Sequence, residues 1–201
     1  MLWSYQPVAH RISNQNNRSI SEEVVLMLKI IVIVIVVLIA ALLVFAATKP
    51  GTFSVVRTAS IKATPEKIFP LINDFHKWSF WSPWEKLDPA MKRIYSGPDS
   101  GKGSAYSWDG NNKVGKGSME ITGTAPQSKV TIKLDFEKPM AGHNVTDFTL
   151  EGKDDSTIVT WNMHGPSPYL TKVIGIFFNM DKMIGRDFEI GLANLKAIAE
   201  K

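Results

Sequence analysis

The sequence predicts an α+β domain in which a curved antiparallel sheet packs around one long C-terminal helix, preceded by a single N-terminal transmembrane helix. Three observations predict this arrangement. An unbroken apolar run occupies residues 30–47, short alternating strand patterns separated by turn residues fill residues 91–165, and the last segment carries one apolar stripe at helical spacing. We therefore expect residues 52–201 to fold as one domain.

The apolar run from Ile30 to Ala47 reads IIVIVIVVLIAALLVFAA and is 18 residues long. At a helical rise of about 1.5 Å per residue it spans roughly 27 Å, which is close to the hydrocarbon thickness of a bilayer. Lys29 and Lys49 flank the run as interfacial charges. We expect a transmembrane helix over residues 28–48, with the lipid bilayer as the partner of residues 30–47.

A cleaved signal peptide is the alternative interpretation of the same run. Val44-Phe45-Ala46 offers a small-residue cleavage site, but the run is longer than the roughly 7–15 apolar residues usual in signals, so an uncleaved anchor is preferred. Basic residues are almost equally numerous on the two sides of the run, and the positive-inside rule gives nearly a tie. The short N-terminal lead favours a domain outside the cytoplasm, and we expect a single-pass protein of the bacterial inner membrane.

Residues 1–26 differ from everything that follows. They are polar, rich in Asn and Ser, and without sustained periodicity, which predicts disorder. Met27-Leu28-Lys29 then leads directly into the apolar run, as an anchor starting at its own methionine would. The hypothesis is that translation begins at Met27 and that residues 1–26 are an extension that is not native; an N-terminus of the natural protein upstream of Met27 would contradict it.

The domain is expected to open with a strand and two short helices. FSVVRTASIKA alternates as a strand does. Thr64 as N-cap and Pro65 at the first helical position then begin a short helix that reaches Asn73. The aromatic stretch WSFWSPW, residues 78–84, follows as a second short helix or turn.

Six further strands are predicted from alternating runs joined by brief turns, the pattern of a single antiparallel meander. The runs are MKRIYSG, GSAYSWDG, GKGSMEITGT, VTIKLDFEK, NVTDFTLEG and TIVTWNMHG. The tail carries apolar residues at spacings of 4, 4, 3 and 3, which form one face of a long helix. These residues are Ile184, Phe188, Leu192, Leu195 and Ile198. Such a helix can bury its stripe in the concave face of the sheet.

Composition excludes several classes of function. The net charge of +4 comes from mixed charges without basic runs, which argues against nucleic-acid binding. The absence of cysteine removes disulfide scaffolds, thiolate metal sites and Cys nucleophiles. No pair of histidines shows metal-ligand spacing, and neither a metal nor a cofactor is expected.

The order of elements resembles the helix-grip fold of the START-like, polyketide cyclase/dehydrase-like superfamily, also called SRPBCC. Local sequence strengthens the resemblance over roughly residues 50–200: ATPEKIF leading to NDFHKW and WSPW, then GKG, YSW, a second GKG, TIVTW and GLANLK. The chain is similar to the membrane-anchored, single-span branch of that superfamily. Its members include cyclases, hydroxylase domains, lipid carriers and hormone receptors, so the resemblance implies the fold and a pocket between sheet and helix more than a reaction.

Strand alternation predicts which side chains line that pocket. The inward set is apolar, with Tyr106 and Thr146 as its strand hydroxyls, and each carboxylate placed on a strand faces outward. Trp78, Trp81 and Trp84 are expected to form an aromatic plug at one end, serving packing first, ligand contact second and membrane contact third. The predicted ligand-contacting residues are Trp78, Trp81, Trp84, Tyr106, Trp108, Met119, Ile121, Ile132, Leu134, Phe136, Phe148, Trp161, Met163, Phe188 and Leu192.

Catalytic signals are sparse. The candidate catalytic residues are His76 beside the aromatic stretch, His143 in the loop after Pro139, and Tyr106. Asp187 and Glu189 lie near the apolar stripe of the last helix, and we expect them on its solvated face.

Three functions follow as hypotheses. The first is a membrane-tethered module that binds a hydrophobic or amphipathic small molecule, such as a lipid, in its cavity. The second is a polyketide cyclase/dehydrase-like enzyme, and the third is a structural or regulatory membrane protein with an unidentified protein partner. The apolar interior and the anchor favour the first.

Overall fold

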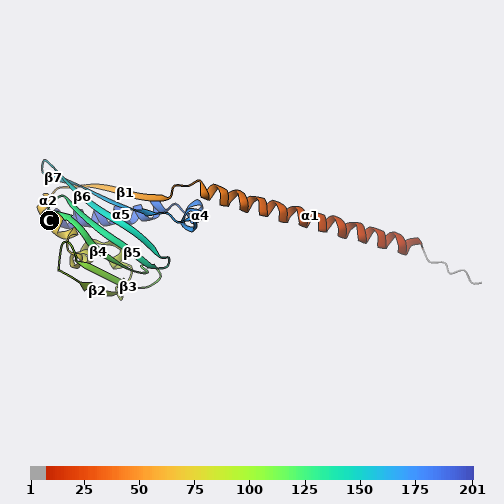
Figure 1. Ribbon diagram of the computed structural model, residues 1–201, viewed down its shortest axis with the longest axis horizontal. Coiled ribbons are helices and arrows are strands. Elements are labelled where there is room, and N and C mark those ends of the chain that lie inside the picture. The colour runs from red at the N-terminus through yellow and green to blue at the C-terminus, as the bar shows by residue number, and fades with distance from the viewer. Residues whose placement is uncertain (1–7) are drawn as a thin grey trace, which may run out of the picture. The chain divides into compact units, whose positions relative to one another are not determined.

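The computed structural model describes the backbone of residues 8–201 and the side chains of residues 22–201. The chain divides into two compact units, Met1–Lys49 and Pro50–Lys201 (Figure 1). The first residues of the predicted N-terminal extension, 1–7, lie outside the described part. Each unit is considered by itself below.

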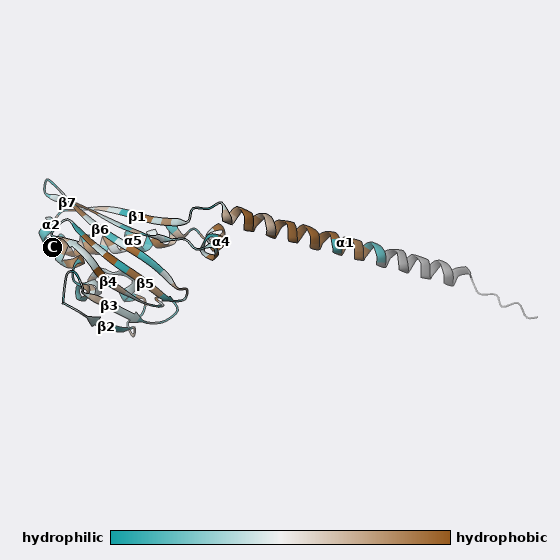
Figure 2. Ribbon diagram, viewed as in Figure 1, coloured by the Kyte–Doolittle hydropathy of each residue, from teal (hydrophilic) through white to brown (hydrophobic). Residues whose placement is uncertain are grey.

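The described part of the first unit is the helix α1, Val8–Ala47, with the two residues that follow it. Its segment Glu22–Ala47 is long and apolar enough to cross a membrane, and an 18-residue stretch within it has a mean hydropathy of 3.6 (Figure 2). Membrane anchors and signal sequences share these properties. The predicted disorder of residues 8–26 is wrong for the described backbone, which is helical there. Once a helix has nucleated, each further residue adds one hydrogen bond at little entropic cost, so the apolar segment can carry a polar extension.

The second unit is built on a single antiparallel sheet of seven strands in the order β1-β7-β6-β5-β4-β3-β2. Strands β2 to β7 form the predicted meander, and β1 extends it as an edge strand by pairing with β7. The bounds are β1 Thr52–Ile61, β2 Lys92–Ser96, β3 Ala105–Asp109, β4 Lys116–Ala125, β5 Lys129–Lys138, β6 Gly142–Lys153 and β7 Ser156–Pro166. All six predicted strand runs are confirmed, as is the opening strand.

Short helices and one long helix complete the unit: α2 Pro65–Ile72, η1 Phe75–Lys77, α3 Trp78–Trp81, η2 Pro83–Lys86, α4 Tyr169–Phe177 and α5 Met180–Ala199. The first short helix begins with Pro65 as predicted, but the side chain of Thr64 makes no capping hydrogen bond. Helix α4 was not predicted, because its nine-residue sequence YLTKVIGIF is shorter than the stretch over which a helical apolar stripe is recognised.

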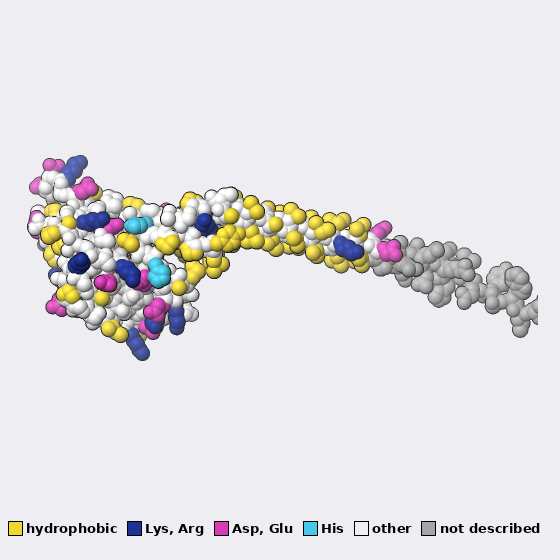
Figure 3. All heavy atoms as spheres, viewed as in Figure 1, with side chains coloured by type: hydrophobic (Ala, Val, Ile, Leu, Met, Phe, Trp, Pro, Cys, Tyr) yellow, Lys and Arg dark blue, Asp and Glu magenta, His cyan; other side chains and the backbone are white. Residues whose placement is uncertain are grey.

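The core lies between the concave face of the sheet and α5. The inward-facing strand residues that alternation predicts are buried or half-buried, and the hydropathy bands along β4, β5 and β6 in Figure 2 follow that alternation. Phe188, Leu192 and Leu195 of α5 are almost fully buried. On the face seen in Figure 3, acidic and basic side chains are interspersed over the second unit. The chain is therefore of mixed α+β class, with a curved sheet and a long C-terminal helix as expected.

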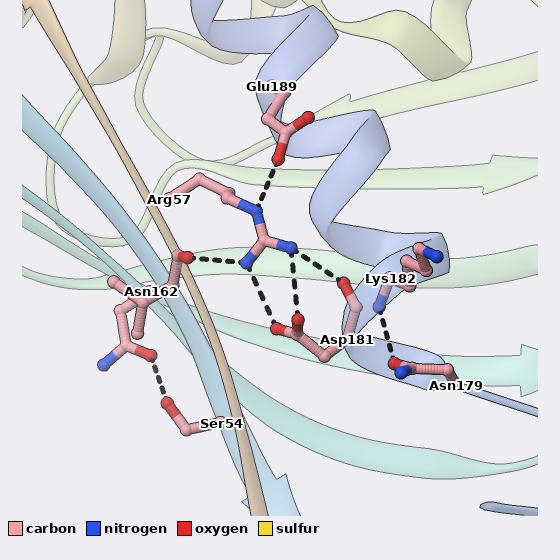
Figure 4. A network of polar contacts seen from close by, with 8 residues as sticks. Ser54, Arg57, Asn162, Asn179, Asp181, Lys182 and Glu189 are labelled. Atoms are coloured by element: carbon pink, nitrogen blue, oxygen red, sulfur yellow. Dashed lines mark hydrogen bonds and ion pairs between the residues drawn. The ribbon is translucent and has the colours of Figure 1, made fainter.

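An arginine ties the start of α5 to β1 (Figure 4). Arg57 Nε lies 2.7 Å from Glu189 Oε1, and Arg57 Nη1 lies 3.1 Å from Asp181 Oδ1. Its Nη2 donates to the Asp181 carbonyl oxygen over 3.1 Å. A Cβ on Gly185 would collide with the guanidinium, so a residue without a side chain lets Arg57 lie across the helix. This contact fixes the N-terminal half of α5 against β1.

Candidate functional site

A cavity of about 500 Å³ lies between the concave sheet and the N-terminal half of α5. Its size falls within the range of roughly 300–1,000 Å³ found for small-molecule sites. Most of its walls are apolar or aromatic, and a small number of polar groups interrupt them. The interior is thus not fully packed.

The cavity opens at one end of the sheet. Its exposed lining residues come from the β3–β4 turn, the β5–β6 loop with the adjoining strand ends, the end of β7 and the residue before α4, and the first residue of α5. These residues are Asn112, Lys113, Lys138, Pro139, Met140, Ala141, His143, Pro166, Pro168 and Met180. Because Thr52 is paired with Pro166, the first strand begins at this same end. The mouth is therefore at the end where the chain enters the domain.

The aromatic stretch WSFWSPW closes the opposite end. Trp78 Nε1 donates to the Ile72 carbonyl oxygen over 2.9 Å, and Trp81 Nε1 donates to the Leu71 carbonyl oxygen over 2.9 Å. Both indoles are almost fully buried and satisfied by the backbone of α2, so they mainly pack the core. Trp84 is half-buried and lines the cavity.

Trp161 of β7 and Phe188 of α5 form part of the wall between sheet and helix. Their rings are stacked with centroids 4.0 Å apart and planes 7° apart. Trp84 meets the Trp161 ring edge-on at 5.8 Å. A Cβ on Gly191 would lie 2.8 Å from Trp161 Cζ3, so this glycine allows α5 to approach the indole. The wall is fixed by close packing.

A buried carboxylate lies among these aromatic residues. Glu85, in η2, has a side chain that is 8% exposed, and it lines the cavity. Tyr106 donates its hydroxyl to Glu85 Oε1 over 2.8 Å, and Arg93 Nε lies 2.8 Å from Glu85 Oε2. The arginine supplies the opposite charge that a buried carboxylate requires.

Tyr106 stays protonated in this setting. Burial, and then the hydrogen bond to Glu85 and the negative charge of that carboxylate, raise the pKa of Tyr106 above its usual value. Its hydrogen is committed to Glu85, so the phenol oxygen can only accept a hydrogen bond from a ligand.

Asp187 is a second acidic group at the cavity, which corrects the prediction that it lies on a solvated helix face. It is half-buried and lines the cavity. Burial raises its pKa, and the positive charge of Arg186 partly opposes this shift. Glu189 is exposed as expected, although its carboxylate is bound to Arg57.

Two polar atoms of cavity-lining residues have no hydrogen-bond partner among the described residues. They are Thr146 Oγ1 and Trp161 Nε1, and both are buried. Unsatisfied buried polar atoms are uncommon because each costs free energy. Rotation about χ1 can bring the Thr146 hydroxyl to another of the three staggered positions on Cβ, so this hydroxyl is a candidate ligand contact.

The histidines are placed differently from one another. His143 lies on the cavity mouth, with a side chain that is 79% exposed and with Nδ1 2.7 Å from Asp135 Oδ1. His76 does not line the cavity; its ring stacks on Tyr95 at 4.2 Å. Within residues 22–201, no group of three His, Asp or Glu side chains is arranged to hold a metal ion.

Ten of the predicted ligand-contacting residues line the cavity: Trp78, Trp84, Tyr106, Trp108, Met119, Leu134, Phe136, Trp161, Met163 and Phe188. Five do not: Trp81, Ile121, Ile132, Phe148 and Leu192, which are buried in the core instead. Their inward direction is as predicted, but they lie farther from the mouth, where α2 packs against β6 and α5 and fills the concave face.

Glu85 was missed because it lies on no strand and alternation cannot place it. The one available signal was its position directly after the WSFWSPW stretch, with Arg93 eight residues later.

Comparison with known proteins adds to this geometry. Residues 52–200 match the family model described as polyketide cyclase / dehydrase and lipid transport. None of the curated proteins matches the chain. Similar solved structures include protein CV1439 from Chromobacterium violaceum, with 14% identity, a TM-score of 0.53, and coverage of 76% of this chain and 99% of that one.

Two further structures show the same arrangement. The Aha1 dimer from Colwellia psychrerythraea has 19% identity and a TM-score of 0.53, with 74% of this chain and 96% of that one covered. Protein MLL2253 from Mesorhizobium loti has 15% identity and a TM-score of 0.54, with 73% and 96% covered. Such low identities show a shared fold alone.

Proposed function

Because the chain belongs to the polyketide cyclase / dehydrase and lipid transport family, we propose that it binds a hydrophobic or amphipathic small molecule in the cavity beneath α5, as a domain anchored to a membrane by α1. The single observation that carries the proposal is the open cavity of about 500 Å³ with apolar walls. A domain evolved only for packing or protein contact would gain stability by filling such a space.

The polar groups of the cavity support an amphipathic ligand. Glu85 and Tyr106 are buried on its wall, and both offer lone pairs rather than free hydrogens. A ligand with an apolar body and one hydroxyl or amine hydrogen would complement them. The remaining wall would contact the apolar body.

The N-terminal helix supports a membrane location. A ligand of this kind partitions into lipid, and a domain held at the bilayer would be close to that reservoir. Helix α1 ends at Ala47 and β1 begins at Thr52, so four residues link them, with a reach of at most roughly 14 Å.

Native mass spectrometry of the full chain, extracted in mild detergent from lipid-rich membranes, tests the proposal. We expect a copurifying small molecule, and we expect Leu134→Trp to remove it, because Leu134 lines the cavity and the larger ring would fill it. Ile94→Trp, at a side chain that is 66% exposed, is the matched control. Met119→Trp is a second cavity-filling variant if the first unfolds.

A chain that carries no small molecule, or a Leu134→Trp variant that retains it while the fold is intact, would overturn the proposal. The fold is checked by circular dichroism and by the urea midpoint.

The alternative function is a polyketide cyclase/dehydrase-like enzyme, favoured by the presence of Glu85, Tyr106 and His143 on one cavity. The contacts argue against proton transfer by Glu85 and Tyr106. Arg93 is bound to the Glu85 carboxylate, and burial keeps the Tyr106 phenol protonated. If turnover of a polyketide substrate is found, Tyr106→Phe and His143→Asn should abolish it. Unchanged turnover in both variants would rule out these residues as catalytic.

A further inference from the structure

Helix α4 and the residues after it expose an unusual number of large apolar side chains. None of the residues of α4 is buried, although its sequence is mostly apolar. We call the following residues the α4 surface: Leu170, Phe177, Phe178, Met180 and Met183. Their exposed fractions range from 36% to 66%, and they follow one another within fourteen positions of the chain. Exposed apolar side chains that gather in this way mark an interaction site more often than single ones do.

The α4 surface borders the mouth of the cavity. Met180 belongs to the α4 surface and also lines the cavity. Thr171, which follows Leu170 in α4, lines the cavity as well. Ser167 N, just before the helix, donates to the Gly51 carbonyl oxygen over 2.7 Å. The surface is therefore held beside the point where the chain enters the domain from its apolar N-terminal segment.

Chain length argues that this surface meets lipid. Only residues 48–51 separate the end of α1 from the start of β1, a distance of at most roughly 14 Å when fully extended. If α1 spans a bilayer, the end of the domain that carries Thr52 cannot lie far from the lipid headgroups. That end is the one that carries the mouth and the α4 surface.

Charge is consistent with the same partner. Lys172, Lys182 and Arg186 lie on α4 and the first turns of α5, and their side chains form no ion pair within residues 22–201. Lys113 and Lys138 add positive charge at the mouth. Basic side chains around an apolar patch match the headgroup region of a membrane, where anionic lipids attract them.

We propose that the α4 surface inserts its apolar side chains into the interfacial layer of the lipid bilayer, so that the mouth of the cavity faces lipid. This inference rests on the membrane anchoring included in the proposed function, and it adds a second membrane contact made by the domain itself. A ligand would then pass between bilayer and cavity without crossing bulk water, in keeping with the hydrophobic character of the cavity walls.

Because the chain has no cysteine, a single fluorophore can be placed at will. The full chain is reconstituted in vesicles of phosphatidylcholine and phosphatidylglycerol with brominated acyl chains, with a bimane label on Met183→Cys. A label on Ile94→Cys reports on a position outside the α4 surface, because Ile94 lies on β2 and is 66% exposed. We expect the bromine atoms to quench the label at 183 and to leave the label at 94 unquenched.

A second pair of variants separates insertion from simple tethering. Phe177→Ser with Phe178→Ser removes apolar contacts while the tether stays intact, so quenching of the label at 183 should be lost. Phe80→Ser is the control, since Phe80 is as exposed as Phe177, at 66%, but lies on α3. Equal quenching at both labels, or quenching that survives the double substitution, would overturn the proposal.

Two readouts keep this proposal separate from the proposed function. Flotation of the vesicles at high pH reports whether α1 anchors the chain, and native mass spectrometry reports whether the cavity holds a ligand. Anchored, ligand-bound chains without quenching would overturn the α4 contact alone. Crosslinking between two copies through Met183→Cys, in place of lipid quenching, would also overturn it and would identify a second copy as the occupant.

Discussion

The hydroxyl of Tyr106 on β3 donates to Glu85 Oε1 in η2 over 2.8 Å, at the wall of the cavity. The pair connects the sheet to the segment that follows the aromatic stretch. Arg93 holds the other carboxylate oxygen at 2.8 Å, so one buried charge is balanced inside an otherwise apolar site. A ligand that reaches this pair meets a carboxylate without a hydrogen and a phenol whose hydrogen is already donated to that carboxylate.

Replacing Tyr106 by Phe should destabilise the domain. The substitution leaves Glu85 Oε1 buried without its donor, and we expect a loss of about 1–3 kcal/mol in the free energy of unfolding, measured by urea denaturation. Tyr95→Phe is the matched control, because no hydrogen bond is recorded for the Tyr95 hydroxyl in the described residues. Equal losses in the two variants would show that the hydrogen bond to Glu85 contributes nothing.

The fold was largely predictable because its signals are local. Alternation in runs such as TIVTWNMHG specifies both a strand and its buried face, and the stripe from Ile184 to Ile198 specifies the long helix. Helix α4 was missed because its nine residues are too few for an apolar stripe to be recognised. The polar N-terminal residues were misjudged because their helix is a continuation of the apolar segment.

The site was predictable only in part. Alternation gives the face of a residue but not its distance from the mouth, so Phe148 and Ile132 were assigned to the cavity although they lie in the core. The contact between Glu85 and Tyr106 joins residues 21 positions apart. No spacing rule brings a residue of a short 3₁₀ helix against a particular strand.

Gly191→Ala should weaken the packing of α5 on the sheet. The added Cβ would lie 2.8 Å from Trp161 Cζ3 and 3.2 Å from Pro83 Cδ, and overpacking of this kind costs about 1–3 kcal/mol. Gly175→Ala is the contrasting helical control, since a Cβ there meets nothing within 4 Å. That change should leave stability equal or raise it by about 0.5–1 kcal/mol. Thermal unfolding of both variants provides the measurement, and a stable Gly191→Ala protein would contradict the packing described for α5.

Asp187→Asn should make the stability of the domain less dependent on pH. Burial raises the pKa of Asp187 in the folded state, so ionisation disfavours folding. This cost is absent below the unfolded pKa of about 3.9, grows as the pH rises through that value, and is complete above the folded pKa. The variant should match the natural protein at acidic pH and exceed it at neutral pH in urea denaturation. A variant that is less stable at neutral pH would show that the carboxylate is instead stabilised there.

Arg57→Ala should loosen the first half of α5. Arg57 is bound to Asp181 and Glu189, and its hydrogen bonds to these partners raise its own pKa and lower that of Asp181. We expect faster amide hydrogen exchange over residues 180–187, with little change in β4 and β5. Gly185→Ala should give the same pattern, because its methyl group would displace the guanidinium. If amide exchange over residues 180–187 is as slow in both variants as in the natural protein, packing alone holds this end of the helix.

Two arginine substitutions in the apolar segment should release the chain from membranes, whereas a single one should not. An arginine at the centre of a membrane helix costs about 2.5–3.5 kcal/mol, a penalty that a segment as apolar as residues 30–47 can absorb once. We expect Leu38→Arg to remain in the membrane pellet after carbonate extraction and the double variant Val34→Arg with Leu38→Arg to appear in the soluble fraction. Val24→Arg, which lies outside the apolar run, is the control. Intact mass of the pelleted protein completes the measurement: retention of residues 30–47 identifies an anchor, whereas a chain that begins after Ala46 would identify a cleaved signal and overturn the anchoring part of the proposed function.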